Sequence, residues 1–333
     1  MQRSMISVVL PCFNAKATLR ASIESVRSQT FEDWDLIVFD DGSTDGSPDL
    51  AREIASEDPR IRVIASSHVG IVQALQRGCA EAHAPFIARM DADDVAHPER
   101  LARQLALMRA MPEAGICGTQ VRMAGRDVGS GRRRYETWVN GLVSHEAMAR
   151  ELFVECPIPH PTFLMRREIF EAAGGYEERG WAEDYDLCMR FFLAGARFGK
   201  VDAPLLDWTE RPNRLSMVDA RYSPENFRAL KRHYLLRSYL ADRQTFYQWG
   251  AGEVGKRWLR EWGAQAPAAV VDINPRKIGR AVHGFKVVAP EDLPAPGAAF
   301  IVVAVGAPNA REEIREWLAA RGYVELEHYL FLA

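Results

Sequence analysis

The sequence lacks both a long apolar run and a paired cysteine motif. No stretch approaches the length of a membrane span, and the segment before the first strand pattern has no apolar core of a secretory signal. The cysteines are scattered, odd in number and without CxxC spacing, which favours reduced thiols over disulfides: Cys12, Cys79, Cys117, Cys156 and Cys188. We therefore expect a soluble cytoplasmic protein, with peripheral contact to the inner face of a membrane as a further option.

An excess of charge of one sign is missing as well. The chain has 42 basic and 45 acidic residues, and its net charge is only -3. Dedicated nucleic-acid-binding proteins usually carry a basic face, so we expect no nucleic-acid partner. The length of 333 residues favours two domains, and a homo-oligomer is compatible with it.

The first part of the chain alternates strand and helix patterns. Short apolar runs occur at residues 6–10, 34–39, 61–64 and 86–90. Helical patterns follow them, after residue 14 and over residues 48–57, 70–82 and 98–110. This alternation predicts an α/β fold with a mostly parallel central sheet and helices on both faces.

Three carboxylates, Asp91, Asp93 and Asp94, follow the fourth apolar run directly. Carboxylates packed this closely repel one another unless a cation lies among them. Oxygen ligands are typical of Mg²⁺ or Mn²⁺, which commonly bridge to substrate phosphates. The alternative is helix capping, since Asp is a favoured cap and Pro98 opens a helical pattern.

Polar clusters also follow the first two strand patterns, at residues 11–14 and 40–43. Ligands of parallel sheets bind at the carboxyl ends of the strands, where these clusters and Asp91 would meet. Capping alone would not place acids at the same end of several strands. The coincidence favours a site for a diphosphate.

Between residues 118 and 150 we expect irregular structure with a basic run, Arg132 to Arg134, near Tyr135 and Trp138. Most charge runs are solvated faces. The alternative is contact with a phosphate-bearing acceptor or an anionic membrane surface.

Two adjacent acids, Glu183 and Asp184, stand at the start of a helical pattern shortly after Trp181. The helix dipole favours a carboxylate there, so capping is one interpretation. A carboxylate that must stay ionised as a general base also suits this position. Three prolines rigidify the preceding loop around His160.

Six segments, in this order, resemble the family 2 glycosyltransferases, which are inverting nucleotide-sugar enzymes with the GT-A fold. They are residues 7–14, 40–43, 70–78, 90–94, 160–167 and 183–187. The resemblance covers roughly residues 5–220, and we place a catalytic domain at residues 1–240. It implies sugar transfer from a nucleotide-diphosphate sugar, with a UDP-sugar expected, to a hydroxyl of a glycan, lipid-linked or other acceptor in bacterial surface polysaccharide biosynthesis.

The resemblance also implies roles for single residues. Asp93 and Asp91 match the metal ligands of a DxD pair, so Mn²⁺ or Mg²⁺ is expected. Asp184 matches the general base, with Glu183 beside it orienting the acceptor or the base, while His160 and Trp181 lie on the acceptor side. Residues expected to bind the nucleotide sugar are Pro11, Phe13, Asn14, Asp40, Asp41, Asp91 and Ala92.

The sequence departs from the family at two places. His68 and Gln76 stand where many relatives have Asn, which leaves the contacts near the base open. In the closing loop, residues 208–216, Arg211 stands where a His often assists the metal. Arginine is a pure donor and cannot bind a cation, so we expect Arg211 and Arg214 to hold the diphosphate. A non-catalytic sugar-nucleotide-binding protein is the alternative.

A strand pattern restarts near residue 241, and Gly250, Gly252 and Gly255 form a GxGxxG turn after it. Asp272 ends the next strand pattern about 20 residues on, as in a dinucleotide fingerprint. A further strand over 299–306 and a helix over 308–321 follow. We predict a small Rossmann-like domain at residues 241–333.

Residues 278–293 of this domain resemble the nucleotide-binding-like N-terminal domain of sugar O-acyltransferases. The domain is too short for a complete dehydrogenase, and its sequence shows no catalytic group. We therefore expect a binding or assembly module with a nucleotide site at the glycine turn. An NAD(P)-linked sugar-nucleotide oxidoreductase is the rival interpretation.

Overall fold

The computed structural model describes residues 4–125, 128–211, 214–243, 245–307 and 309–333. The chain forms two compact units within these ranges. Unit 1 comprises residues up to 149 and residues 156–222, and unit 2 comprises residues 150–155 and 223–333. The predicted domain boundary after residue 240 was based on the restart of the strand pattern. The helix α10 (Pro224–Arg237) precedes that restart and lies in unit 2.

Unit 1 is built on an eight-stranded sheet with the order β3-β2-β1-β4-β7-β6-β8-β5. Its strands are β1 (Ile6–Cys12), β2 (Trp34–Asp40), β3 (Ile61–Ala65), β4 (Phe86–Arg89), β5 (Val95–Ala96), β6 (Ala114–Ala124), β7 (Leu164–Arg166) and β8 (Arg197–Thr209). β1 is parallel to β2 and β4, β2 to β3, and β6 to β8. β7 is antiparallel to β4 and β6, and β5 to β8. The predicted α/β fold with a mostly parallel sheet is confirmed.

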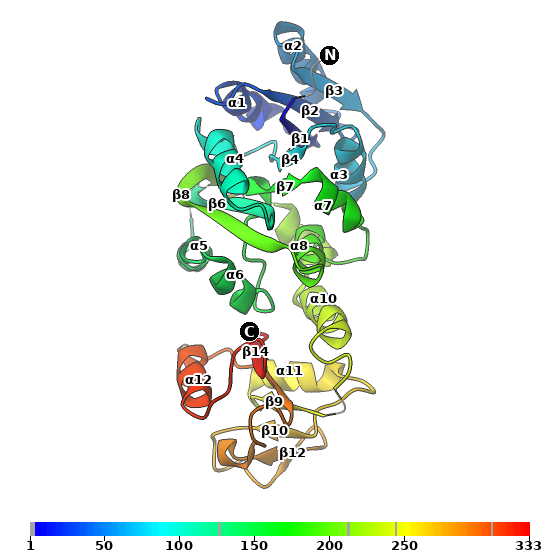
Figure 1. The fold of residues 1–333 in the computed structure, drawn as a ribbon. Helices are drawn as coiled ribbons and strands as arrows, with labels where there is room; N and C mark the ends of the chain where they lie inside the picture. The colour runs from blue at the N-terminus through cyan, green and yellow to red at the C-terminus, as the bar shows by residue number, and fades with distance from the viewer. Residues whose placement is uncertain (1–3, 126–127, 212–213, 244, 308) are drawn as a thin grey trace. The chain divides into compact units, whose positions relative to one another are not determined.

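Helices cover both faces of this sheet (Figure 1). Side chains of α1, α2 and α4 form a core with Val8 and Leu10 on one face of β1. On the other face α3 packs so closely that a Cβ on Gly78 would lie 2.7 Å from Val9 Cγ1. The helices of unit 1 are α1 (Lys16–Arg27), α2 (Ser47–Glu57), α3 (Ile71–Ala80), α4 (Arg100–Ala110), α5 (Ser130–Gly141), α6 (His145–Glu151, whose end belongs to unit 2), η1 (His160–Thr162), α7 (Arg167–Ala172), α8 (Glu183–Leu193), α9 (Leu215–Val218) and η2 (Ala220–Tyr222).

The prediction of irregular structure between residues 118 and 150 is wrong. The structure has the end of β6, then α5 and α6 there, with residues 126–127 outside the described ranges. β6 is rich in small residues, and at Gly118 an added Cβ would overlap Ile158 Cγ2 and lie 2.8 Å from Thr162 Oγ1. α5 buries only Val139, so it lacks the apolar stripe that reveals a helix.

Unit 2 contains a second sheet, with the order β11-β12-β10-β9-β13-β14. Its strands are β9 (Phe246–Trp249), β10 (Ala269–Val271), β11 (Ala281–Val282), β12 (Phe285–Val288), β13 (Phe300–Val303) and β14 (Tyr329–Phe331). All pairings except the antiparallel β11–β12 pair are parallel. Numbered along the chain, the parallel strands lie in the order 3-2-1-4-5, which is the order of a dinucleotide-binding sheet. The helices are α10, α11 (Glu253–Glu261), η3 (Pro290–Asp292) and α12 (Ala310–Ala319).

Two expectations about the whole chain can be compared with the described residues. None of the described helices is long and apolar enough to cross a membrane. All five cysteines are buried and unbridged, as expected for reduced thiols.

Candidate active site

Asp41 fixes the loop between β3 and α3 at the carboxyl edge of the sheet of unit 1. Its carboxylate accepts hydrogen bonds from the backbone N–H groups of Val69 (2.6 Å) and Gly70 (3.0 Å). His68 Nδ1 lies 2.9 Å from the same carboxylate. Asp41 is 3% exposed, so this buried carboxylate positions the loop through its hydrogen bonds.

An aromatic pair stands beside Asp41. The ring of Phe13 is 48% exposed and stacks on His68 with ring centroids 4.2 Å apart. His68 is one of the departures noted in the sequence, and its role was not predicted. Its stacking and its contact with Asp41 make it part of the same wall, a surface suited to a flat base.

The other residues predicted to hold the nucleotide lie at the same edge. Pro11 is buried in β1 opposite Phe39, and Asp40 ends β2 opposite Cys12. Asp40 Oδ2 accepts the Ser43 N–H at 3.3 Å, whereas buried Oδ1 has no hydrogen-bond partner among the described residues. Asn14 is exposed and accepts the Thr44 N–H at 2.9 Å.

Asp91, Asp93 and Asp94 lie together after β4. Each can place one carboxylate oxygen within 4.8 Å of the others. Asp91 forms an ion pair with Arg89, and Arg211 Nε lies 3.5 Å from Asp93 Oδ2. Burial, and next the negative charge of Asp91, raise the pKa of Asp93. The cluster therefore carries the electrostatic strain that a cation would relieve.

Asp94 does not cap a helix, so the alternative of helix capping is wrong for this residue. α4 begins at Arg100, and Asp94 is 1% exposed. Its Oδ1 accepts the Thr209 N–H of β8 at 2.8 Å, while Oδ2 has no hydrogen-bond partner among the described residues. Burial and the charge of Asp91 raise its pKa well above the usual range. Ala92, between the acids, is also buried.

Arg89 is a functional residue that sequence reasoning missed. It is 5% exposed, lies in β4 and pairs with Asp91. Its positive charge also acts to lower the pKa values of Glu183 and His160. A charged residue inside an otherwise apolar strand was the available signal, because buried arginines are rarely left unpaired.

Glu183 and Asp184 occupy the first turn of α8. Glu183 is 2% exposed and accepts hydrogen bonds from the Tyr222 hydroxyl at 2.8 and 3.1 Å. Burial raises its pKa. Asp184 Oδ1 accepts the N–H of Tyr185 at 2.7 Å.

His160 lies between Glu183 and Tyr176. Its Nδ1 is 3.6 Å from Glu183 Oε1, and its Nε2 is 2.8 Å from the Tyr176 hydroxyl. Burial, and then the charge of Arg89, lower the pKa of His160 well below its usual value, so the ring is neutral at neutral pH. Trp181, predicted on the acceptor side, donates its indole N–H to Asp186 at 2.8 Å.

A pocket of about 240 Å³ joins the two groups of acids. It is lined from the end of β4, from η1, from the start of α8 and from the segment after β8: Arg89, Asp91, Asp93, His160, Glu183, Asp184, Trp208, Arg214 and Tyr222 are among its residues. Trp181 and the nucleotide-side residues at the ends of β1 and β2 are not among the described residues that line this pocket. The structure thus gathers Asp91, Asp93 and Asp184 around one space.

The closing loop is tied to the basic run of α5. Glu210 accepts hydrogen bonds from Arg214 (2.7 Å) and Arg132 (2.9 Å). The Arg132 guanidinium also lies over the rings of Tyr135 and Trp208, 5.2 Å from each centroid. Arg132 is therefore part of a packed network, whereas Arg134 is exposed. Residues 212–213 of the loop lie outside the described ranges.

Comparison with known proteins agrees with this geometry. Residues 7–174 match the family described as Glycosyl transferase family 2. A Bacillus subtilis (strain 168) protein named as a glycosyltransferase, EpsE, is 29% identical over 226 residues, which is 66% of this chain and 78% of EpsE.

Two solved structures resemble this chain in fold. One is S. aureus TarS 1–349 in complex with UDP-GlcNAc, with a TM-score of 0.56 and 18% identity over 69% of this chain and 66% of that chain. The other is the mannosyltransferase PcManGT from Pyrobaculum calidifontis in complex with GDP-Man and Mn²⁺, with a TM-score of 0.52 and 18% identity over 72% of this chain and 64% of that chain. The chain thus spans just under two thirds of these two structures. They establish the GT-A fold, and because the family match covers half of the chain, the chain belongs to glycosyl transferase family 2.

Proposed function

We propose that unit 1 is an inverting glycosyltransferase that moves a sugar from a nucleotide-diphosphate sugar to a hydroxyl of a glycan or other glycoconjugate. The observation that carries this proposal is that two separate acid pairs line one pocket. Asp91 and Asp93 come from the end of β4, and Glu183 and Asp184 from the start of α8. One pair suits the leaving diphosphate and the other suits the attacking hydroxyl.

The donor would bind along the carboxyl edge of the sheet. Phe13 and His68 offer stacked rings for the base, and Asp41 fixes the loop beside them. UDP-GlcNAc and GDP-Man are bound by the two similar structures, which supports a nucleotide sugar as the donor class. We expect a UDP-sugar and a role in bacterial surface polysaccharide biosynthesis.

Asp91 and Asp93 would hold a divalent cation, Mn²⁺ or Mg²⁺. The donor set fits, because it is all oxygen and because buried Asp94 Oδ2 next to it has no hydrogen-bond partner among the described residues. When bound, such a cation neutralises negative charge on the leaving diphosphate. Arg211 and Arg214 would donate hydrogen bonds to the diphosphate oxygens from the closing loop.

Asp184 would act as the general base. It removes the proton of the acceptor hydroxyl while that oxygen forms a bond to the anomeric carbon and the bond from this carbon to the diphosphate oxygen breaks. A single displacement of this kind inverts the configuration, whereas retention through two displacements needs a second carboxylate as nucleophile. Glu183, held by Tyr222 and next to His160, would orient the acceptor or the base.

Substituting Asp184 by Asn tests the base directly. We expect transfer from a panel of UDP- and GDP-sugars with Mn²⁺ to be abolished, while calorimetry shows nucleotide-sugar binding largely unchanged. Retained turnover would overturn the assignment of the base. Wild-type protein that binds a donor but never transfers or hydrolyses it would instead support the non-catalytic alternative.

Asp93→Ala tests the cation site separately. We expect nucleotide binding to lose its dependence on Mn²⁺, because Asp93 would supply one of the cation's ligands. Unchanged affinity in the presence of Mn²⁺ would count against this role.

A further inference from the structure

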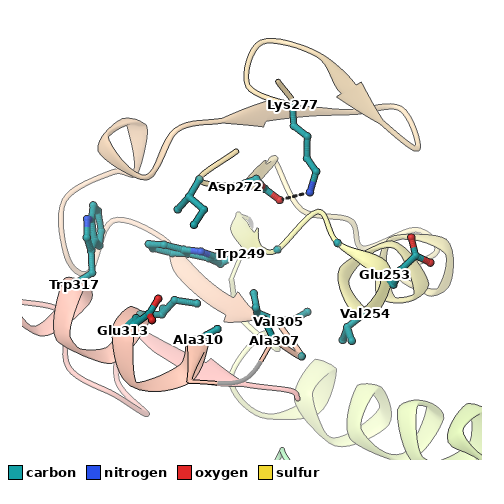
Figure 2. Close-up of a pocket in the computed structure, with 16 residues that line it drawn as sticks. Trp249, Glu253, Val254, Asp272, Lys277, Val305, Ala307, Ala310, Glu313 and Trp317 are labelled. Carbon is teal, nitrogen blue, oxygen red and sulfur yellow. Dashed lines mark hydrogen bonds and ion pairs between the residues drawn. The ribbon is translucent and has the colours of Figure 1, made fainter. Parts of the chain in front are cut away.

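Unit 2 contains a pocket of about 590 Å³ that plays no part in the proposed transfer reaction. It lies at the carboxyl ends of β9, β10 and β13, where the strand order reverses between β9 and β13. Open parallel sheets bind ligands at this place. Figure 2 shows the Trp249 indole across the middle of the pocket, with Asp272 and Lys277 above it and Val305 and Ala310 below.

The three fingerprint glycines have different explanations. Gly250 has a φ of +118°, and a Cβ there would overlap the backbone of Ala304. At Gly255 a Cβ would overlap the backbone oxygen of Gly250. Packing within the unit therefore requires glycine at both positions, as the predicted close approach of helix and strand implies.

At position 252, neither the backbone conformation nor the packing within the unit requires a glycine. Its φ is -83°, and an added Cβ would meet nothing within 4 Å. It lines the pocket at the start of α11. The missing side chain keeps open the space directly above the peptide, where a ligand group can approach the backbone.

The apolar part of the pocket is aromatic. Trp249 and Trp317 meet edge to face, with ring centroids 5.1 Å apart and planes at 75°. Ile273, which is 73% exposed, lines the same pocket. An exposed aliphatic side chain beside two indoles offers a surface for a flat heteroaromatic ring.

The polar part is built around Lys277. Its Nζ lies 2.9 Å from Asp272 Oδ2 and 3.1 Å from the backbone oxygen of Ala251. Asp272 Oδ2 also accepts the Ala251 N–H, at 3.0 Å, and Oδ1 accepts the Asn274 N–H, at 2.8 Å. Both carboxylate oxygens are thus bonded within the chain. Asp272 holds the glycine turn and positions Lys277, instead of presenting free oxygens to a ribose as the fingerprint predicts.

The charges around the pocket limit the ligand. Among the described residues that line it, Lys277 is the cationic side chain and is paired with Asp272, and Glu253 and Glu313 add two further carboxylates. A nucleoside triphosphate, with its dense negative charge, would be repelled. A diphosphate esterified at both ends carries less charge and fits one lysine better.

We propose that this pocket binds a nucleoside 5′-diphosphate ester. The base would lie against Trp249, Trp317 and Ile273, and the diphosphate between the Gly252 peptide and Lys277. Dinucleotides and nucleotide sugars share this chemistry. The site would be a second nucleotide site on the chain, and its existence does not depend on the reaction of unit 1.

Calorimetry on the full chain in EDTA tests the proposal with three probes: ADP-ribose, NAD⁺ and UDP-GlcNAc. We expect at least one probe to bind wild-type protein, and Lys277→Ala, Trp317→Ala and Gly252→Val each to weaken it tenfold or more. Lys286→Ala is the matched control, since Lys286 is exposed on β12. A preference for ADP-ribose and NAD⁺ would identify a dinucleotide site, and a preference for UDP-GlcNAc a nucleotide-sugar site.

Two results would overturn the proposal. One is that no probe binds wild-type protein at millimolar concentration. The other is that a probe binds wild-type protein and all unit 2 variants equally, which would place the binding outside this pocket. Thermal unfolding without ligand checks that each variant folds, and Trp317→Phe replaces Trp317→Ala if the latter does not.

Discussion

The hydroxyl of Tyr222 donates to Glu183, 2.8 Å from Oε2 and 3.1 Å from Oε1. The two residues are 39 positions apart in the sequence, and the bond joins η2, after the closing loop, to the first turn of α8. The Glu183 carboxylate, which is 2% exposed, therefore has a hydrogen-bond donor directly beside Asp184, the proposed base. A hydrogen bond thus joins η2 directly to the acid pair.

Tyr222→Phe should weaken both stability and activity. The buried carboxylate of Glu183 loses its phenol donor, so we expect the free energy of unfolding to fall by about 1–3 kcal/mol. Transfer should fall roughly tenfold if Glu183 orients the reacting groups. Urea unfolding and initial rates measure the two effects. Tyr247→Phe is the control, because no hydrogen bond of its hydroxyl is found within the described residues; equal behaviour of both variants would contradict the prediction.

His160 should make the protein sensitive to acid. Its pKa in the folded state lies well below the 6.5 of an unperturbed histidine. Below pH 6.5 the unfolded chain therefore takes up a proton that the folded chain rejects, and the free energy of unfolding falls by up to about 1.4 kcal/mol per pH unit. Above pH 6.5 this contribution is constant.

Urea unfolding at pH 7.5 and 5.5 measures this dependence. His160→Gln should lose less stability between the two values than wild type. His83→Gln, at an exposed position, is the control and should keep the wild-type difference. A wild-type difference retained in His160→Gln would refute the assignment.

Arg89→Met should destabilise unit 1 through the acids that it leaves behind. Removing one partner of a buried ion pair costs about 3–5 kcal/mol, and we expect the lower end because the Asp91 side chain is 28% exposed. Added Mn²⁺ should recover part of the loss, since a cation that binds only the folded state stabilises it. Arg20→Met breaks an exposed pair with Glu53 and should cost less than about 1 kcal/mol. Equal unfolding midpoints for the two variants in urea would contradict the prediction.

Gly118 and Gly141 form a matched pair for thermal unfolding. An alanine at Gly118 would clash with Ile158 and Thr162, so we expect a loss of about 1–3 kcal/mol. At Gly141, the last residue of α5, an added Cβ meets nothing within 4 Å. Gly141→Ala should therefore be neutral or stabilising by up to about 1 kcal/mol. A lower melting temperature for Gly141→Ala than for Gly118→Ala would contradict the close packing inferred at Gly118.

The sequence predicts β1, β2 and β4 well because these apolar runs are almost entirely buried. β1 reads as such a run, and the acids after β4 are visible because they interrupt it. The same reasoning fails for β6 and α5. In β6, glycines and polar residues interrupt the apolar run, and in α5 Val139 alone does not make a periodic stripe.

Contacts over long sequence distances account for the residues that were missed in the site. His68 reads as a departure from a family pattern, and only the fold places it against Phe13 and Asp41. Tyr222 carries no sequence signal that connects it to Glu183. The role of Asp272 was predicted from a spacing. The spacing does not show that Lys277 and the Ala251 N–H already bond to Oδ2, or that the Asn274 N–H bonds to Oδ1.

Unit 2 is not one uninterrupted stretch of chain. Residues 150–155 belong to it, and within it Glu151 pairs with Arg311 and Arg315, the latter at 2.6 Å. A recombinant fragment beginning at residue 223 would contain both arginines without this carboxylate. Cutting the gene at the sequence boundary would therefore not release an intact unit, and any exchange of this unit between proteins would have to carry a short piece of the catalytic domain with it.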